Sequence, residues 1–363
     1  MGWIPSLRLL LSLIIGVFLC VGFARANSYN VGVYYFPAWY SSSEYWNDLR
    51  GLEGSRSPGR SWPEREPLLG FNYPEEDFKI AEKHLQWMYE YGIDFIIYDW
   101  YWKKDNTTKL EHAINAYLKA KNNNKVKFTI LWANETDVPV NLQQFTLMVS
   151  YWINNYFNKK QYVTIDGKPV VFIFSPERLR DSASSFGMTS KDLLDIARKM
   201  SREAGYGGIY FVGCAQAIEY FIKDFLPNNG YDAISAYNYH RGYSGVYEKG
   251  GLAVNYSQLS AGYKQSWEWI LSNTSLPYFL PVTAGWSKKP WGSFTPHDEC
   301  ISDPNSFKEH LLASKEYIDS YNIKTKSTVV ICCWNEFAEG SYIEPTKRWQ
   351  FQYLQAVKDV FGR

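Results

Sequence analysis

Residues 329–340, VVICCWNEFAEG, carry the strongest structural signal in this sequence. The stretch opens with an apolar run and ends with two glutamates, Glu336 and Glu339, followed by a glycine. A short apolar run without polar alternation is typical of a strand that is buried on both faces in a parallel sheet. The stretch therefore predicts a buried strand whose carboxyl end delivers two acidic side chains.

Seven further segments show the same pattern of short, largely apolar and β-rich runs. Together with residues 328–334, the predicted strands are residues 31–36, 95–99, 128–132, 170–174, 209–214, 233–236 and 279–284. The predicted amphipathic helices are residues 76–91, 109–121, 142–157, 190–204, 218–225, 257–271, 306–321 and 349–361. Strands that alternate with helices in this way predict an α/β fold, a single (β/α)8 TIM barrel over residues 27–363.

Three connections in this predicted barrel are longer than simple turns. They span residues 41–74, 238–256 and 285–305, and each of them follows the carboxyl end of a strand. That end of a (β/α)8 barrel carries the active site, and long loops in compact domains are commonly functional. We therefore expect these long loops to form walls around a ligand on the catalytic face.

The predicted strand ends combine aromatic rings with carboxylates and amides. Rings can cover the apolar faces of sugars, whereas Asp, Glu and Asn side chains can hydrogen bond their hydroxyls. Core packing would explain a single tryptophan, but here the combination recurs at several strand ends. The predicted substrate-binding residues are Tyr35, Trp39, Asp99, Trp100, Trp132, Asn134, Glu135, Tyr237, Trp286 and Asn335.

Glu336 and Glu339 are the predicted catalytic residues. Glycosidic bond cleavage commonly uses two carboxyl groups, one that protonates the leaving oxygen and one that acts as base or nucleophile. If the chain enters a helical turn after the strand, a spacing of three residues turns both side chains into one cavity. Two like charges held close together raise one pKa, which provides an acid and a base near neutral pH. An isolated ExxE motif is more often a pair of solvated loop acids, so this interpretation depends on the preceding strand.

The sequence resembles glycoside hydrolase family 99 and its WbsX-like relatives. NEFAEGSYIEP, residues 335–345, is similar to the family 99 motif NEWHEGxxIEP, and the segments VGVYYFPAWY, GIDFIIYDWYW and LWANE resemble the WbsX-like group. The resemblance implies a (β/α)8 enzyme that cleaves α-mannosides with retention, through a 1,2-anhydro sugar. It also implies that Glu336 removes the proton of the sugar 2-hydroxyl, and that Glu339 is the general acid and later the base.

This sequence departs from the family 99 pattern in two places. The Trp and His between the two acids of the family are Phe337 and Ala338 here, which removes a polar contact and leaves mannose specificity open. The WANE segment also differs from the corresponding strand of family 99. Asn134 and Glu135 are therefore assigned to sugar binding only.

Three functions remain open from the sequence. The first is a glycoside hydrolase that acts on a polysaccharide or glycan, for which we expect an α-mannoside-like substrate. The second is a glycosyltransferase of polysaccharide biosynthesis, for which the WbsX-like group is named, and the third is a non-catalytic glycan-binding barrel. A predicted export signal and the lack of a Gly-rich phosphate loop disfavour a transferase, and the two retained acids disfavour binding alone. Two carboxylates suffice for hydrolysis, so no metal or organic cofactor is expected.

The N-terminus predicts export. Arg8, the apolar residues 9–23 and the small-x-small residues 24–26 are typical of a secretory signal peptide cleaved after Ala26. The apolar run is shorter than the roughly 20 residues of a membrane span, so we expect a secreted or periplasmic protein without stable membrane insertion. A net charge of +1, from 38 Lys and Arg against 37 Asp and Glu, argues against nucleic-acid binding through a basic surface.

Four cysteines remain after this predicted cleavage, and no CxxC or His-pair spacing among them indicates zinc. An oxidising compartment would permit one disulfide. Cys332 and Cys333 are adjacent on a predicted strand, so we expect them to point to opposite faces. The favoured interpretation is that the cysteines pack in the core as small apolar residues.

Overall fold

The computed structural model describes residues 1–2, 29–240 and 251–362. The predicted signal peptide, including its cleavage site after Ala26, lies outside the described residues. Among the described residues, no helix combines the length and the apolar character that are needed to cross a membrane.

Within these residues, eight parallel strands form the wall of a TIM barrel, and they match the eight strands predicted from the sequence. In sheet order, they are β8 (Ala233–Ser235), β7 (Tyr210–Cys214), β6 (Lys168–Ile173), β4 (Lys127–Trp132), β2 (Phe95–Trp102), β1 (Asn30–Tyr35), β12 (Thr328–Cys332) and β9 (Leu280–Thr283). The predicted (β/α)8 fold is therefore confirmed.

The barrel closes through a weak seam between β8 and β9. One isolated parallel bridge, between Ile234 and Tyr278, joins the two strands. Two backbone hydrogen bonds of 2.9 Å flank it, from Ile234 N to Pro277 O and from Phe279 N to Ile234 O. By contrast, β2 and β4 share six paired positions. The barrel is thus nearly closed, with one seam held by fewer bonds than its opposite side.

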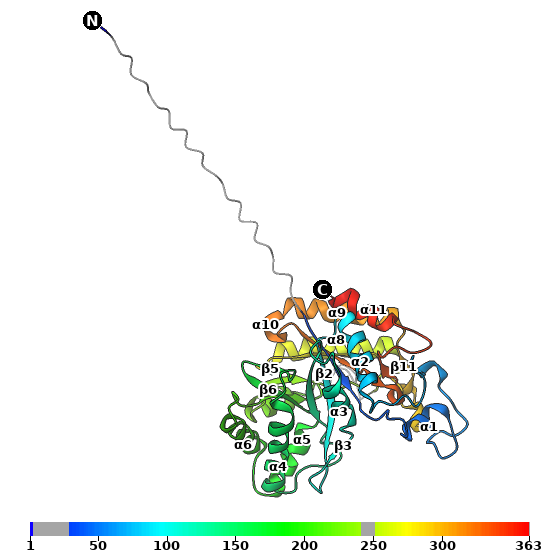
Figure 1. The fold of residues 1–363 in the computed structure, drawn as a ribbon, viewed down its shortest axis with the longest axis horizontal. Coiled ribbons are helices and arrows are strands. Elements are labelled where there is room, and N and C mark those ends of the chain that lie inside the picture. Colours follow the sequence, from blue (N-terminus) through cyan, green and yellow to red (C-terminus); the bar gives the residue numbers. More distant parts are fainter. Residues whose placement is uncertain (3–28, 241–250, 363) are drawn as a thin grey trace.

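Helices surround this barrel (Figure 1). Those predicted from the sequence are α2 (Phe78–Glu90), α3 (His112–Lys119), α4 (Leu142–Trp152) with the π-helix η2 (Ile153–Phe157), α6 (Ser190–Glu203), the π-helix η3 (Tyr220–Phe225), α8 (Tyr256–Asn273), α9 (Pro304–Ser320) and α11 (Gln352–Phe361). Side-chain caps begin several of them: Thr189 and Asp192 form a capping box at α6, and Asp303 caps α9.

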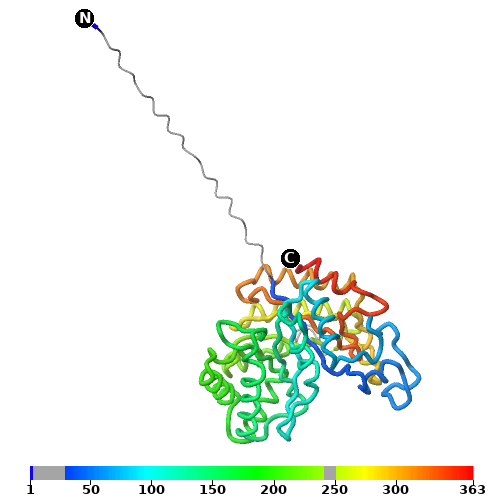
Figure 2. Tube along the Cα trace, in the orientation of Figure 1, coloured from blue at the N-terminus to red at the C-terminus, as the bar shows by residue number. Residues whose placement is uncertain are grey.

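Two helices of six or more residues in the described part of the chain were not predicted. α5 (Pro176–Ser185) begins with Ser175 as its cap and Pro176 at its first position, but few of its residues are buried, so its apolar signal is weak. α1 (Tyr45–Arg50) lies inside the long connection that follows β1. In Figure 2 this connection (blue) lies on one side of the molecule, and the middle third of the chain (green) lies on the other.

Side chains along the strands alternate between two apolar layers, as strand geometry requires. The outward layer packs against the helices and includes Tyr35, Tyr98, Trp100, Ile130 and Trp132. The inward layer fills the barrel and includes Tyr34, Ile97, Leu131, Val330 and Cys332. This alternation determines which residue at each strand end faces the interior of the barrel.

Cys332 and Cys333 form a disulfide with each other, across a cis peptide bond. The expectation that they point to opposite faces as separate core residues is therefore wrong. It assumed that the strand continues through Cys333, whereas β12 ends at Cys332, so the alternation of an extended strand does not apply there. Among the described residues, Cys214 and Cys300 are buried free thiols.

Candidate active site

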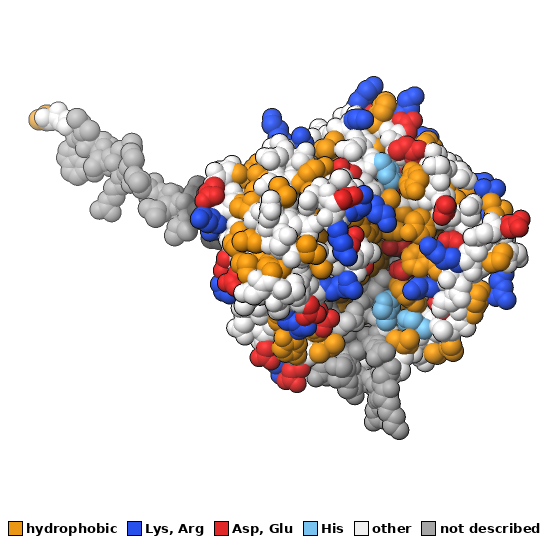
Figure 3. Space-filling view, turned by 90° about the horizontal axis from the view of Figure 1, so that it is seen from below, with side chains coloured by type: hydrophobic (Ala, Val, Ile, Leu, Met, Phe, Trp, Pro, Cys, Tyr) orange, Lys and Arg blue, Asp and Glu red, His pale blue; other side chains and the backbone are white. Residues whose placement is uncertain are grey.

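A cavity of about 540 Å³ lies at the carboxyl ends of the barrel strands. Figure 3 views the molecule from below Figure 1 and shows a hollow where acidic and apolar side chains gather, with histidines beside it. The cavity wall is built from the ends of β2, β4, β6, β7 and β8 and from the segments that follow β9 and β12. The predicted site residues in its lining are Asp99, Glu135, Tyr237, Trp286, Glu336 and Glu339.

Local backbone geometry turns Glu336 and Glu339 into this cavity together. Glu336 ends the short strand β13 (Asn335–Glu336), and Glu339 ends a single 3₁₀ turn, η7 (Phe337–Glu339). Glu336 precedes this turn with a non-helical backbone (φ −74°, ψ 62°), and one turn of three residues carries the chain from it to Glu339. Gly340 closes it with φ 68°, and a Cβ there would lie 3.1 Å from the backbone N of Ser287. Only glycine meets both requirements without strain.

Burial changes the ionisation of both acids. Glu336 is 4% exposed, and its burial, together with Glu339 and Asp99 nearby, raises its pKa well above the usual range. Burial raises the pKa of Glu339 to about 7, although the positive charge of Lys288 opposes the rise. A carboxyl group with this pKa is protonated in about half of the molecules at neutral pH. Glu339 can therefore act as a proton donor there.

Three carboxyl oxygens of the cavity residues are buried without a hydrogen-bond partner among the described residues. They are Oδ1 of Asp99, Oε2 of Glu135 and Oε2 of Glu336. Unsatisfied buried oxygens are rare in proteins, and a ligand with several hydroxyl donors would satisfy them. No group of three or more His, Cys, Asp and Glu side chains in the described part of the chain could hold a metal ion.

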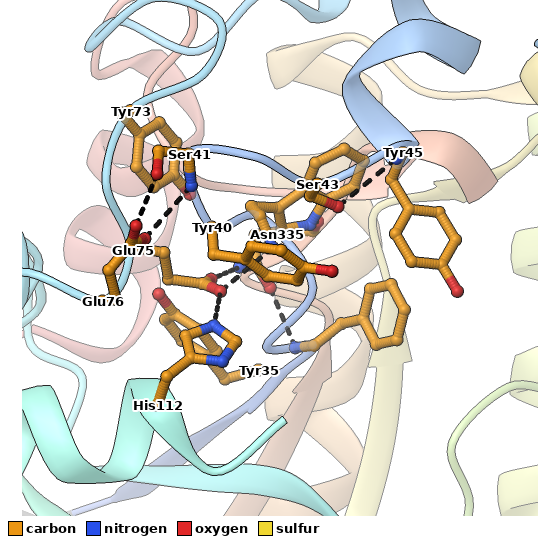
Figure 4. Close-up of polar contacts among 12 residues, drawn as sticks. Tyr35, Tyr40, Ser41, Ser43, Tyr45, Tyr73, Glu75, Glu76, His112 and Asn335 are labelled. Carbon is orange, nitrogen blue, oxygen red and sulfur yellow. Dashed lines mark hydrogen bonds and ion pairs between the residues drawn. The ribbon is translucent and has the colours of Figure 1, made fainter. Parts of the chain in front are cut away.

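A hydrogen-bond network around Glu75 holds the segment before Glu336 in place (Figure 4). Oε2 of Glu75 accepts a bond from Trp39 N at 3.0 Å and lies 2.8 Å from His112 Nε2. Its Oε1 accepts a bond of 3.3 Å from Asn335 Nδ2, and Trp39 Nε1 donates to Asn335 O at 2.7 Å. Trp39 and Asn335 are absent from the cavity lining, so their expected role in substrate binding is corrected to support of β13.

Four other predicted binding residues also lie outside the cavity lining. The Tyr35 hydroxyl lies 3.3 Å from His84 Nδ1. Trp100 Nε1 donates to the hydroxyl of Tyr156, in η2, at 2.8 Å. Trp132 packs among rings of α4. Asn134 exchanges two hydrogen bonds with the backbone of Ser175, at 2.8 and 2.7 Å. These assignments are corrected: three side chains point outward by strand alternation, and the fourth joins two strand ends.

Several residues that line the cavity were not among the predicted site residues. Tyr101 could have been found, because it lies two positions after Asp99 on the same strand and so shares its face. Lys109 could not have been found from the sequence. It reaches the cavity because β3 (Thr108–Lys109) folds back on β2. Gln216 follows β7, and its Nε2 donates to Asn238 O at 2.8 Å.

Residues 63–357 match the family described as "Glycosyltransferase WbsX". The chain belongs to the WbsX family. The matched range includes both acids and most of the barrel, and the resemblance stated from the sequence motifs is thereby confirmed. No curated protein matches the sequence.

Two solved structures with the same fold as this WbsX-family chain carry glycoside hydrolase descriptions. A "glycoside hydrolase-like protein" is 16% identical, with a TM-score of 0.65, over 92% of this chain and 94% of that one. The family 99 endo-alpha-mannosidase from Bacteroides thetaiotaomicron is 15% identical, with a TM-score of 0.59, over 92% of this chain and 97% of that enzyme. At this identity the similarity establishes a shared TIM-barrel fold along nearly the whole of each chain.

Proposed function

We propose that this WbsX-family chain is a glycoside hydrolase that cleaves glycosidic bonds in an oligo- or polysaccharide. One observation carries the proposal: Glu336, which precedes a single 3₁₀ turn, and Glu339, which ends it, line the same cavity, where burial raises the pKa of both. Two carboxyl groups are what this hydrolysis requires. The unpartnered oxygens of Asp99 and Glu135 supply acceptors for sugar hydroxyls.

In this proposal the two acids have different roles. Glu339 protonates the glycosidic oxygen, and afterwards its carboxylate activates the incoming water. Glu336 removes the proton of the sugar 2-hydroxyl, so that this oxygen closes on the anomeric carbon and the aglycone departs. Water then opens the 1,2-anhydro sugar with retention of configuration. Tyr237, hydrogen bonded to Glu336 Oε1 at 2.9 Å, orients the base.

We further propose an α-mannoside-like substrate and a secreted or periplasmic location. The shared fold with a family 99 endo-alpha-mannosidase supports the first. Phe337 and Ala338, which differ from the family 99 motif, are fully buried and absent from the cavity lining, so they affect packing rather than direct sugar contacts. The signal-peptide pattern around residues 9–26 supports the second.

Leaving-group dependence tests the roles of the acids. The mature protein is screened against polysaccharides that include α-mannans, and the variants are then assayed on a cleaved substrate and on its activated aryl glycoside. Glu339→Gln should lose about 10²–10⁴-fold on the natural substrate and much less on the aryl glycoside. Glu336→Gln should lose activity on both. Glu177→Gln, which changes another acid in the cavity lining, is the matched control.

Two outcomes would contradict this scheme in different ways. Turnover near the wild-type rate by both Glu336→Gln and Glu339→Gln would exclude them as the catalytic pair. Turnover of a 2-deoxy substrate would exclude only the 1,2-anhydro route, because that route needs the 2-hydroxyl.

The family description favours one second candidate, a glycosyltransferase. A transferase would move a sugar from an activated donor to a glycan acceptor, and a hydrolase would transfer it to water. Incubation with nucleotide sugars and oligosaccharide acceptors, followed by mass spectrometry, separates the two. A longer oligosaccharide that forms only with the nucleotide sugar would replace the hydrolase proposal.

A further inference from the structure

Tyr237 lies between two buried carboxyl groups that come from different strands. Its Oη is 3.0 Å from Oδ2 of Asp99, near the end of β2, and 2.9 Å from Oε1 of Glu336, in β13. Asp99 is 5% exposed and Glu336 is 4% exposed. A phenol has a single proton to donate, so Tyr237 can donate to only one of these carboxyl groups at a time.

The other short contact is favourable only if the second carboxyl group carries a proton and donates it to Tyr237 Oη. If both acids were ionised, one contact would place two acceptors against each other, in addition to the repulsion between like charges. Burial raises the pKa of Asp99, of Glu336 and of Tyr237, so the phenol keeps its own proton. With one proton on the two carboxyl groups, both short contacts of Tyr237 Oη are therefore hydrogen bonds.

We propose that Asp99 and Glu336 share one proton through Tyr237, and that Asp99 is the positioning residue that allows Glu336 to ionise. The proton on Glu336 Oε1 moves to Tyr237 Oη while the hydroxyl proton of Tyr237 moves to Asp99 Oδ2. The total charge is unchanged, and Glu336 becomes a carboxylate. The catalytic consequence, a base available for the sugar 2-hydroxyl, rests on the proposed hydrolase function.

Other titratable groups also act on these two acids from the surrounding strands and turns. They are Glu135, Glu339, Tyr101, Tyr34 and Cys214. All of them stay in place in single variants of Asp99 or Tyr237, so their effect on Glu336 is common to the wild type and these variants. Asp99→Asn also removes a negative charge, so Tyr237→Phe, which keeps both carboxyl groups, is the variant that reports on the hydrogen-bonded proton.

The test is a pH titration of Glu336 in the substrate-free protein. Glutamate carboxyl groups are labelled with ¹³C, and the acid and carboxylate bands are followed by infrared spectroscopy, with Glu336→Gln used to assign the signal. The wild type should titrate in two steps, since coupled sites share their ionisations. Asp99→Asn should remove the coupling to Asp99 and move the ionisation of Glu336 to lower pH, while its coupling to Glu339 remains. Tyr237→Phe should shift the first ionisation upward, and each shift should be about one unit or more.

Tyr34→Phe is the matched control. Tyr34 is a buried tyrosine that packs against Tyr237 at 4.7 Å, but its hydroxyl contacts Cys214 and neither acid. It should leave the two-step titration of Glu336 in place. If Asp99→Asn and Tyr237→Phe also leave it unchanged, the shared proton is excluded. Because no substrate is needed, this result does not depend on whether the chain hydrolyses glycans. In a confirmed hydrolase, the acidic limb of the kcat profile should move in the same directions.

Discussion

Glu339 is the residue whose ionisation should control activity near neutral pH. A general acid works only while it is protonated, so kcat should be highest below pH 7 and should fall as the pH rises through about 7. Since Lys288 lowers the pKa of Glu339, Lys288→Met should move this alkaline limb to higher pH. The measurement is the pH profile of kcat on a cleaved glycan.

A neighbouring lysine provides the control for this prediction. Lys289 pairs with Glu299 at 2.5 Å, so Lys289→Met should leave the alkaline limb where it is. An alkaline limb that persists unchanged in Glu339→Gln would assign this ionisation to another group.

The two long connections after β1 and β9 meet the turn η7 at Arg65. This buried side chain donates from Nη1 to Phe337 O at 2.8 Å and to Ser287 O at 3.1 Å, and from Nη2 to Ser287 Oγ at 2.9 Å. Lysine cannot reproduce this planar fork. Arg65→Lys should therefore reduce the free energy of unfolding by about 1.5–3 kcal/mol and lower kcat more than it changes KM.

Denaturant unfolding and steady-state kinetics on the same preparations measure both effects. Arg60→Lys, in an exposed part of the same connection, should change neither by a measurable amount. Equal stability and kcat for Arg65→Lys and Arg60→Lys would show that Arg65 does not position the turn.

The loop beside Trp286 depends on one ionised side chain, Asp298. Burial alone would raise its pKa, but hydrogen bonds from Thr295, Ser293 and the backbone N of Lys288 outweigh it and lower the pKa to about 2. A depressed pKa stabilises the fold above the unfolded value of 3.8, and this stabilisation is lost as the pH falls toward 2. Asp298→Asn should cost about 2 kcal/mol at pH 7.

The pH dependence distinguishes this effect from a general loss of packing. The difference in unfolding free energy between wild type and Asp298→Asn should be constant above about pH 4 and should shrink between pH 4 and pH 2. The exposed Asp181 gives a comparison, since Asp181→Asn should show no such change. A difference that persists at low pH would mean that the carboxylate charge is not the cause.

The whole barrel should open first at the seam between β8 and β9. Local stability follows the number of hydrogen bonds and packed contacts, and this seam has one isolated bridge where β2 and β4 have six paired positions. Amide hydrogens of β8 should therefore exchange faster than those of β4 in hydrogen-exchange mass spectrometry. Slower exchange in β8 than in β4 would show that the seam is as cooperative as the rest of the barrel.

The local pattern of the sequence was sufficient to predict the barrel and a turn that brings Glu336 and Glu339 into one cavity. Strands buried on both faces must be almost wholly apolar, so their number and order can be predicted from the sequence. Glu336 precedes η7 and Glu339 ends it, and their placement in one cavity follows from a turn that involves only neighbouring residues. Helix α5 escaped prediction because Leu179 is the single large aliphatic side chain among its ten residues.

Tertiary structure decided which way the aromatic side chains point and which residues support the two acids. An apolar strand looks alike on both faces, so nothing local shows that Asp99 points into the barrel and Trp100 away from it. Arg65 meets Phe337 and Asn335 meets Glu75 across separations of 272 and 260 residues. Such contacts exist only after β1 has paired with β12, because this pairing brings the first and last wall strands of the barrel side by side.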